Sequence, residues 1–168
     1  MSLLSAQVIA TGRLDLLPLE VAHAPEMAGV LSDPALHTFI GGAPHTPHSL
    51  RARYERLTAG SPDPAVAWLN WVIRLRAENC LTGTVQATVT ASDTEIAWVV
   101  GTPWQGRGIA GEAARELVDW LSGQQVRSVI AHVHPGHHAS AAVARSAGLA
   151  PTDIRQDGET RWSRRLRP

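Results

Sequence analysis

Two glycines, Gly106 and Gly108, lie between an apolar stretch and a long amphipathic stretch of this chain. Glycine lacks a Cβ, so the backbone N–H groups of such a turn can converge on one point. A helix that begins directly after the turn adds its own unpaired N–H groups and the positive end of its dipole. This arrangement is suited to phosphate or pyrophosphate, and Arg107 is expected to add a charge-assisted contact. The same glycines would also suit an ordinary strand-to-helix turn, so their neighbours must decide between the two.

The flanking residues predict a strand before the turn and a helix after it. Residues 95–100 are rich in β-branched and aromatic side chains and end at Gly101-Thr102-Pro103, which predicts a buried strand. From Gly111 onward, apolar residues recur at the spacing of one helix face, and Gly123 is the expected end. The turn therefore joins a strand to the N-terminus of a helix.

The glycine pattern fits one nucleotide-binding signature better than the others. Gly106, Gly108 and Gly111 have the spacing of a dinucleotide fingerprint, but no acidic residue ends a following strand about 20 residues on, so a redox domain that binds NAD is a weak alternative. Gln105, Gly108 and Ala110 fill the pattern Gln/Arg-x-x-Gly-x-Gly/Ala. On these residues the chain resembles the GNAT superfamily of N-acetyltransferases, whose signature loop holds the pyrophosphate of coenzyme A.

The resemblance implies where acetyl-CoA, the co-substrate, would bind. In the GNAT fold the strand before the loop diverges from the next parallel strand, and the pantetheine arm pairs with backbone groups in the gap. Backbone N–H groups near Val99 would then face the oxyanion. The implied cofactor-binding residues are Trp98, Val99 and Val100 for the pantetheine arm, and Gln105, Gly106, Arg107, Gly108, Ile109 and Ala110 for the pyrophosphate.

A second motif follows at residues 137–140. It is similar to the Asn-x-x-Ser segment of the family, with His137 in place of asparagine, and Leu149 stands where phenylalanine is usual. Ala144 occupies the position at which many GNAT enzymes carry a tyrosine that protonates the departing thiolate. The resemblance implies that His137 and Ser140 contact the cofactor and that Ser140 protonates the thiolate instead. The alternative is that Ser140 only caps a helix.

Acetyl transfer to an amine also requires a base, because a free amine is mostly protonated near neutral pH. Glu95 begins the strand before the loop, where several family members keep their base. His132 lies on the next predicted strand, where others keep a glutamate, and histidine titrates in the useful range. The alternatives are an exposed strand end for Glu95 and a hydrogen-bonded core histidine for His132. We favour Glu95.

Other features of the chain restrict its function. The 15 basic and 15 acidic residues balance, which argues against binding to nucleic acid or an anionic membrane. A single cysteine, Cys80, fits a reducing cytoplasm, and neither a signal peptide nor an apolar run of spanning length occurs. Four histidines could suggest zinc, but no carboxylate or cysteine is spaced to complete a site, so no metal is expected. These histidines are His132, His134, His137 and His138.

The order of predicted elements is similar to a single GNAT domain over residues 1–168, an α/β fold with a mostly antiparallel sheet that diverges between two parallel strands. The branch that acetylates ribosomal-protein N-termini (RimJ/RimL-like) is the most similar. The acceptor would be a protein N-terminus or a small-molecule amine, and a non-catalytic acyl-CoA sensor is the alternative. The sequence leaves open whether the protein forms a homodimer.

The expected strands are 13–18, 67–76, 81–91, 95–100, 127–134, 152–156 and 159–166; the expected helices are 21–31, 36–40, 47–59, 111–122 and 139–147.

Overall fold

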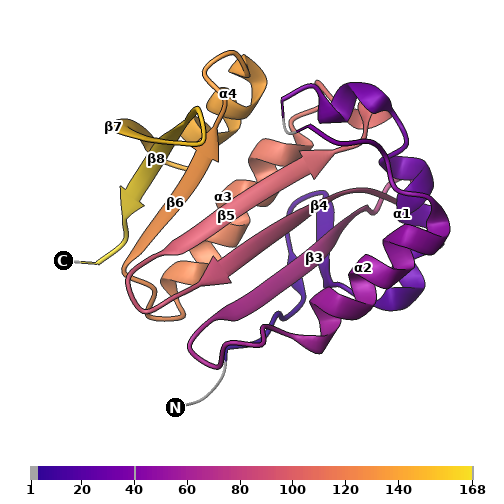
Figure 1. The fold of residues 1–168 in the computed structure, drawn as a ribbon, viewed down its shortest axis with the longest axis horizontal. Helices are drawn as coiled ribbons and strands as arrows, with labels where there is room; N and C mark the ends of the chain where they lie inside the picture. Colours follow the sequence, from indigo (N-terminus) through magenta and orange to yellow (C-terminus); the bar gives the residue numbers. More distant parts are fainter. Residues whose placement is uncertain (1–3, 40, 168) are drawn as a thin grey trace.

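The computed structural model describes residues 4–39 and 41–167 (Figure 1). The strands are β1 (Ile9–Ala10), β2 (Leu14–Pro18), β3 (Ala67–Leu75), β4 (Cys80–Val89), β5 (Thr94–Val100), β6 (Ser128–Val133), β7 (Ala150–Gln156) and β8 (Glu159–Arg165). The helices are α1 (Ala24–Val30), α2 (Pro47–Ala59), α3 (Ile109–Ser122) and α4 (His138–Ser146), with short 3-10 helices η1 (Val21–His23), η2 (Pro34–His37) and η3 (Thr102–Trp104).

The eight strands form one sheet in the order β1-β2-β3-β4-β5-β6-β8-β7. Every neighbouring pair is antiparallel except β5 and β6, which are parallel and are connected through α3. The predicted mixed sheet with one parallel pair is therefore confirmed. The terminal hairpin of β7 and β8 also forms as predicted, turning at Asp157 and Gly158, which both have positive φ.

The helices cover both faces of the sheet. One core includes Ile96 of β5 and Leu117 of α3, so α3 packs on the face to which the even-numbered residues of β5 point. The other core joins Val72 of β3 to Tyr54 of α2, together with residues of α1. Glu95, Ala97 and Val99 consequently point to the side of α1 and α2.

Most element boundaries follow from local signals, and the exceptions have local causes. Thr46 caps α2 and exchanges hydrogen bonds with Ser49, and Pro47 occupies the first helical position. The predicted helix at 21–31 is instead a 3-10 turn followed by α1, with Pro25 in its first turn, where a missing N–H costs nothing. The turn expected at 36–40 is η2, and Ile40 lies outside the described residues. Strand β1 was not predicted, because two residues carry no periodic signal.

The parallel pair is short. Strand β5 pairs with β4 along its whole length, from Thr94 to Val100. With β6 it pairs only at Thr94 with Val129 and at Glu95 with Ile130. Figure 1 shows the two strands close together at their start and diverging toward their ends. A split in the sheet therefore opens directly after Glu95.

A glycine on β4 supports the far end of β5. The pairing of β3 with β4 shifts at Ile73 and Arg74, so Thr82 forms a bulge. The next residue, Gly83, faces Val100, and a Cβ there would lie 2.1 Å from the carbonyl oxygen of Val99. Only glycine lets the backbone of β5 approach β4 so closely.

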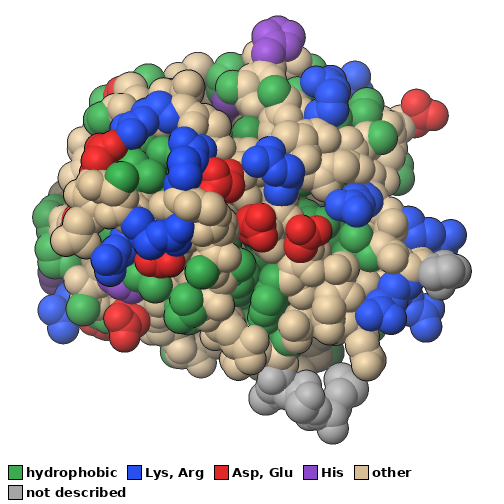
Figure 2. All heavy atoms as spheres, turned by 180° about the vertical axis from the view of Figure 1, so that it is seen from behind, with side chains coloured by type: hydrophobic (Ala, Val, Ile, Leu, Met, Phe, Trp, Pro, Cys, Tyr) green, Lys and Arg blue, Asp and Glu red, His purple; other side chains and the backbone are tan. Residues whose placement is uncertain are grey.

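The surface carries charges of both signs. Figure 2 shows acidic side chains lying between arginines on the face opposite that of Figure 1. Within residues 4–39 and 41–167, no helix is both long and apolar enough to cross a membrane.

Gly83→Ala is expected to destabilise the protein by about 1–3 kcal/mol, because the added methyl group forces β4 and β5 apart. Gly29→Ala is the matched control, since Gly29 is exposed in α1 and has open space around it; alanine there should be neutral or stabilising. Urea unfolding of both variants measures the difference. Equal stability of Gly83→Ala and the parent protein would show that the approach of the two strands is not tight.

Candidate active site

The glycine turn at residues 105–110 is built as a cradle of backbone N–H groups. Gly106 and Gly108 have φ of 76° and 77°, in the left-handed region that favours glycine, and α3 begins at Ile109. A Cβ on Gly106 would meet nothing within 4 Å, so the turn has open space in front of it. Among the described residues, no backbone carbonyl accepts from the N–H groups of Gly106, Arg107 or Gly108. The first N–H groups of α3 are unpaired by helix geometry.

Two arginines lie at the cradle. The guanidinium of Arg107 pairs with Glu78 in the turn between β3 and β4, which draws this side chain toward the turn. Arg13 also supplies a cation: its Nη1 donates to the Arg107 carbonyl (2.9 Å), and its Nη2 lies 3.4 Å from where a Cβ on Gly108 would be. The sequence offered no signal for this residue, because it precedes the cradle by more than 90 positions.

Glu112 holds Arg13 in place. Its carboxylate accepts from Arg13 Nε (2.8 Å), from the Arg13 N–H (3.0 Å) and from the Thr11 hydroxyl (2.5 Å). Burial alone would raise the pKa of Glu112, but these hydrogen bonds and the charge of Arg13 lower it overall. Glu112, the acidic residue in the first turn of α3, is therefore ionised and paired with Arg13. The positive charge of Arg13 offsets its repulsion of an anion in the cradle.

The open edge of β5 offers backbone groups to a ligand. The Gly101 N–H donates to the Thr82 carbonyl on β4 (2.8 Å). Because backbone groups alternate along a strand, those of Val99 also face β4, and those of Trp98 and Val100 face the split. The backbone N–H groups near Val99 that face the split are therefore those of Trp98 and Val100. The Val100 carbonyl accepts from Gln105 Nε2 (3.0 Å), so the Gln105 side chain closes the end of the strand.

On the α2 side, three residues from three strands form a row beside the split. His132 Nδ1 lies 3.0 Å from Glu95 Oε2, and Arg161 Nε donates to His132 Nε2 (3.2 Å). The His132 side chain is only 7% exposed, whereas that of Glu95 is 47% exposed. Glu95 is therefore open to an incoming molecule rather than enclosed, and both ring nitrogens of His132 have partners.

On the α3 side, a different hydrogen bond crosses the split. The Trp98 indole donates to Ser140 Oγ (3.2 Å) at the start of α4. His137 caps α4 by accepting from the Ser140 N–H (3.3 Å), so Ser140 is not itself the cap. An indole N–H can only donate, and within residues 4–39 and 41–167 the Ser140 hydroxyl has no acceptor. Its proton remains available to a ligand.

A loop from the N-terminal half reaches the segment between β6 and α4. The Phe39 ring stacks on His137, with centroids 4.4 Å apart and planes inclined by 21°, and lies 5.0 Å from His134. The Thr102 hydroxyl donates to Asp33 at the start of η2 (2.7 Å). The segment around η2 thus contacts both sides of the split. In the part of the chain that the structure describes, no three histidine, cysteine or acidic side chains are grouped to hold a metal ion.

The acetyltransferase (GNAT) domain family matches residues 13–150. The chain belongs to the GNAT family. Members of this family transfer an acetyl group from acetyl-CoA to an amine, and the free donors of the cradle and the split beside β5 fit that co-substrate. No match is found among curated proteins.

Solved structures of GNAT enzymes share the fold. An acetyltransferase of the GNAT family from Bacillus anthracis aligns with a TM-score of 0.80 and 19% identity, covering 95% of this chain and 99% of that one. The ribosomal-protein alpha-N-acetyltransferase RimL, in complex with coenzyme A, aligns at 0.75 and 14%, covering 95% and 98%. The self-immunity acetyltransferase MccE, in complex with acetyl-CoA and AMP, aligns at 0.74 and 14%, covering 92% and 93%.

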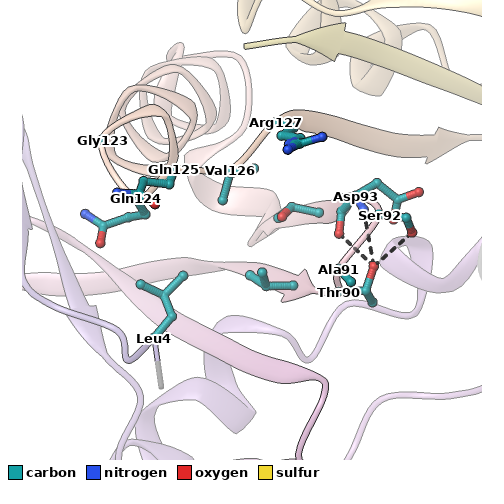
Figure 3. A pocket seen from close by; sticks show the side chains of 12 residues that line it. Leu4, Thr90, Ala91, Ser92, Asp93, Gly123, Gln124, Gln125, Val126 and Arg127 are labelled. Atoms are coloured by element: carbon teal, nitrogen blue, oxygen red, sulfur yellow. Dashed lines mark hydrogen bonds between the residues drawn. The ribbon is translucent and has the colours of Figure 1, made fainter. Parts of the chain in front are cut away.

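A hollow of about 490 Å³ lies at the other end of the sheet (Figure 3). Figure 3 shows Gln124 and Leu4 on one side of it and Asp93 and Arg127 on the other. It adjoins the first residue of β5, whereas the cradle follows the last, and seven residues of strand separate them by roughly 20 Å. This hollow includes neither the glycine turn at residues 105–110 nor the N-terminus of α3, so it is separate from the cradle.

The pKa of His137 provides a test of its capping role. Burial first, and then the neighbouring His134 and His138, lower the pKa of His137 below its ordinary value, which keeps the ring neutral and able to accept. The unfolded chain therefore takes up this proton more readily than the folded one. The stabilisation by His137 is complete above the unfolded pKa of about 6.5 and is lost as the pH falls through the lower folded pKa.

His137→Asn is expected to flatten this dependence, because asparagine caps helices well and does not titrate. Melting temperatures between about pH 7.5 and pH 5 should fall less for the variant than for the parent protein. His48→Asn, at an exposed position of α2, is the control and should melt like the parent. Parallel curves for His137→Asn and the parent would contradict a neutral capping histidine.

Proposed function

We propose that this protein acetylates the N-terminal amine of a peptide or an amide-bearing small amine. The observation that carries the proposal is the split of β5 from β6, which leaves an accessible carboxylate, Glu95, where the split begins, unpaired strand groups along it and a free anion cradle after the end of β5. We propose further that the chain works as a single cytoplasmic domain over residues 1–168. A homodimer remains a proposal that oligomeric-state measurements can address.

The reaction assigns a role to each side of the split. In this proposal, Glu95 removes a proton from the acceptor amine, directly or through water, and the neutral nitrogen attacks the thioester carbonyl. The C–N bond forms and the C–S bond breaks. Backbone N–H groups of Trp98 and Val100 face the gap and support the oxyanion. The Ser140 hydroxyl gives its proton to the departing sulfur, since Trp98 already uses Ser140 Oγ as an acceptor. The attacking nitrogen loses its second proton through water, and this proton restores the Ser140 hydroxyl.

Polar side chains beside Glu95 support the choice of acceptor. Thr88, the partner of Glu95 on β4, lines a hollow of about 100 Å³ under α2. Asn70 and Gln86 face each other across β3 and β4 in the same hollow. Within the described residues, neither carboxamide forms a side-chain hydrogen bond, so each can bind a peptide group. Arg53 lines the hollow on the α2 side and disfavours polyamines.

A non-catalytic acyl-CoA sensor is the second candidate. Ala144 is fully buried and cannot replace the tyrosine acid of other family members. Such a module would bind acetyl-CoA without turning it over. Measurement of free-thiol release with a panel of amines and short peptides separates the two candidates.

Gly106→Ala is expected to weaken acetyl-CoA binding about tenfold or more, because the methyl group occupies the space in front of the cradle. Gly158→Ala is a matched control: its φ of 80° and open surroundings resemble those of Gly106, but it lies in the β7–β8 turn. Both variants should lose about 1–2 kcal/mol of stability from backbone strain, and only the first should lose affinity in calorimetric titration. Equal affinities would place the diphosphate elsewhere.

Glu95→Gln should lower kcat/KM for the best acceptor by about 10²–10⁴, because the amide cannot accept the proton, while acetyl-CoA affinity stays unchanged. Steady-state thiol release and calorimetry measure the two quantities. Glu159→Gln, on β8 away from the split, should leave both unchanged. Full activity of Glu95→Gln would remove Glu95 from the mechanism.

A further inference from the structure

Arg161 stands at the end of the row that contains Glu95. His132 of β6 and Arg161 of β8 are direct partners in the sheet, and Glu95 of β5 pairs with Ile130, two residues before His132. The three side chains therefore point to the same face from three adjacent strands. Arg161 is held in turn by Gln156, whose Oε1 accepts from its Nη2 (3.3 Å). In the sequence Arg161 is one of four arginines among residues 161–167, with no motif to single it out.

The hydrogen bonds of Arg161, His132 and Glu95 determine which nitrogen of His132 carries a proton. A guanidinium only donates, so His132 Nε2, 3.2 Å from Arg161 Nε, must be an acceptor without a proton. An imidazole with one bare nitrogen is neutral and carries its proton on the other, Nδ1. That nitrogen lies 3.0 Å from Glu95 Oε2 and donates to it.

We propose that Arg161 is a positioning residue that fixes His132 as a neutral Nδ1–H donor, so that His132 orients Glu95 and Glu95 alone serves as the base. The proposal rests on the function proposed above and decides between its two candidate bases. His132 is unsuited to remove a proton from the acceptor, because its free lone pair points at Arg161 and its side chain is buried. Arg161 of the terminal hairpin thereby acts on the chemistry through His132.

Two substitutions of His132 separate orientation from base catalysis. In His132→Asn, the amide nitrogen lies near the position of Nδ1 and can still donate to Glu95. In His132→Gln, the carboxamide lies nearer the position of Nε2 and loses that contact. We expect the asparagine variant to keep kcat within about threefold of the parent. The glutamine variant should show a kcat lower by about tenfold or more, because it loses a hydrogen bond to a charged group. Equal loss in both variants would overturn the proposal.

Arg161→Ala tests the positioning role in two backgrounds. In the parent it should lower kcat about tenfold, because the ring can then take the other tautomer. In His132→Asn it should have no further effect, since no tautomer is left to fix. Arg155→Ala, on exposed β7, is the control and should leave kcat unchanged. A tenfold loss from Arg161→Ala that persists in the His132→Asn background would assign Arg161 a different role.

The tautomer can also be observed without turnover. Nitrogen-15 spectra of the imidazole near neutral pH should show a protonated Nδ1 and a bare Nε2 for His132, and a shift toward a protonated Nε2 in Arg161→Ala. A cationic ring or a protonated Nε2 in the parent protein would overturn the proposal. Because this readout needs no acceptor, it separates a failure of the positioning role from a failure of the proposed acetyl transfer.

Discussion

Strand β5 is paired along one edge and almost unpaired along the other. Its contact with β4 extends over all seven residues, and its contact with β6 ends after Glu95. An unpaired strand edge leaves N–H and C=O groups that must find other partners, either water or a ligand with amide groups. The pantetheine arm of acetyl-CoA is such a ligand. In the proposed function the co-substrate would complete this stretch of sheet, and the cradle lies between the end of β5 and the start of α3.

The two faces of the split have different tasks in this arrangement. On the α3 face, Trp98 and Ser140 join β5 to α4 and place a hydroxyl proton beside the gap. On the α2 face, Glu95 and His132 join β5 to β6 where the gap starts. This separation follows from the alternation of side chains along β5, because residues 95 and 98 point to opposite faces. Proton removal from the acceptor and proton delivery to the sulfur can then take place on opposite sides of one thioester.

The arginines around the site bind other residues of the protein and hold them in place. Arg107 is bound to Glu78, Arg13 to Glu112, and Arg161 to His132. A guanidinium offers several donors in a rigid plane, which suits it to hold a carboxylate, a carbonyl or a ring nitrogen at a set position. The Arg13 guanidinium lies beside Gly108 of the cradle, and its charge is balanced by Glu112 of α3. The cradle therefore relies mainly on backbone donors, whose positions do not change with side-chain rotamers.

Local sequence determined the elements and the anion turn. Alternating and helical periodicity, Pro47 after Thr46, and Asp157-Gly158 act within a few residues, so strands, helices and the hairpin followed from them, as did the left-handed glycines of the cradle. The GNAT resemblance added the proposed roles of Glu95, His132 and Ser140, of which Glu95 and His132 lie within hydrogen-bond distance of each other. Tertiary structure alone decided which side chains meet: that Arg107 turns to Glu78, that Arg13 reaches Gly108, that His137 and not Ser140 caps α4, and that Arg161 binds His132. Most of these contacts join residues far apart in the chain. The cap of α4 depends on which of two neighbouring polar side chains reaches the helix N–H group. No short-range sequence pattern specifies contacts of these two kinds.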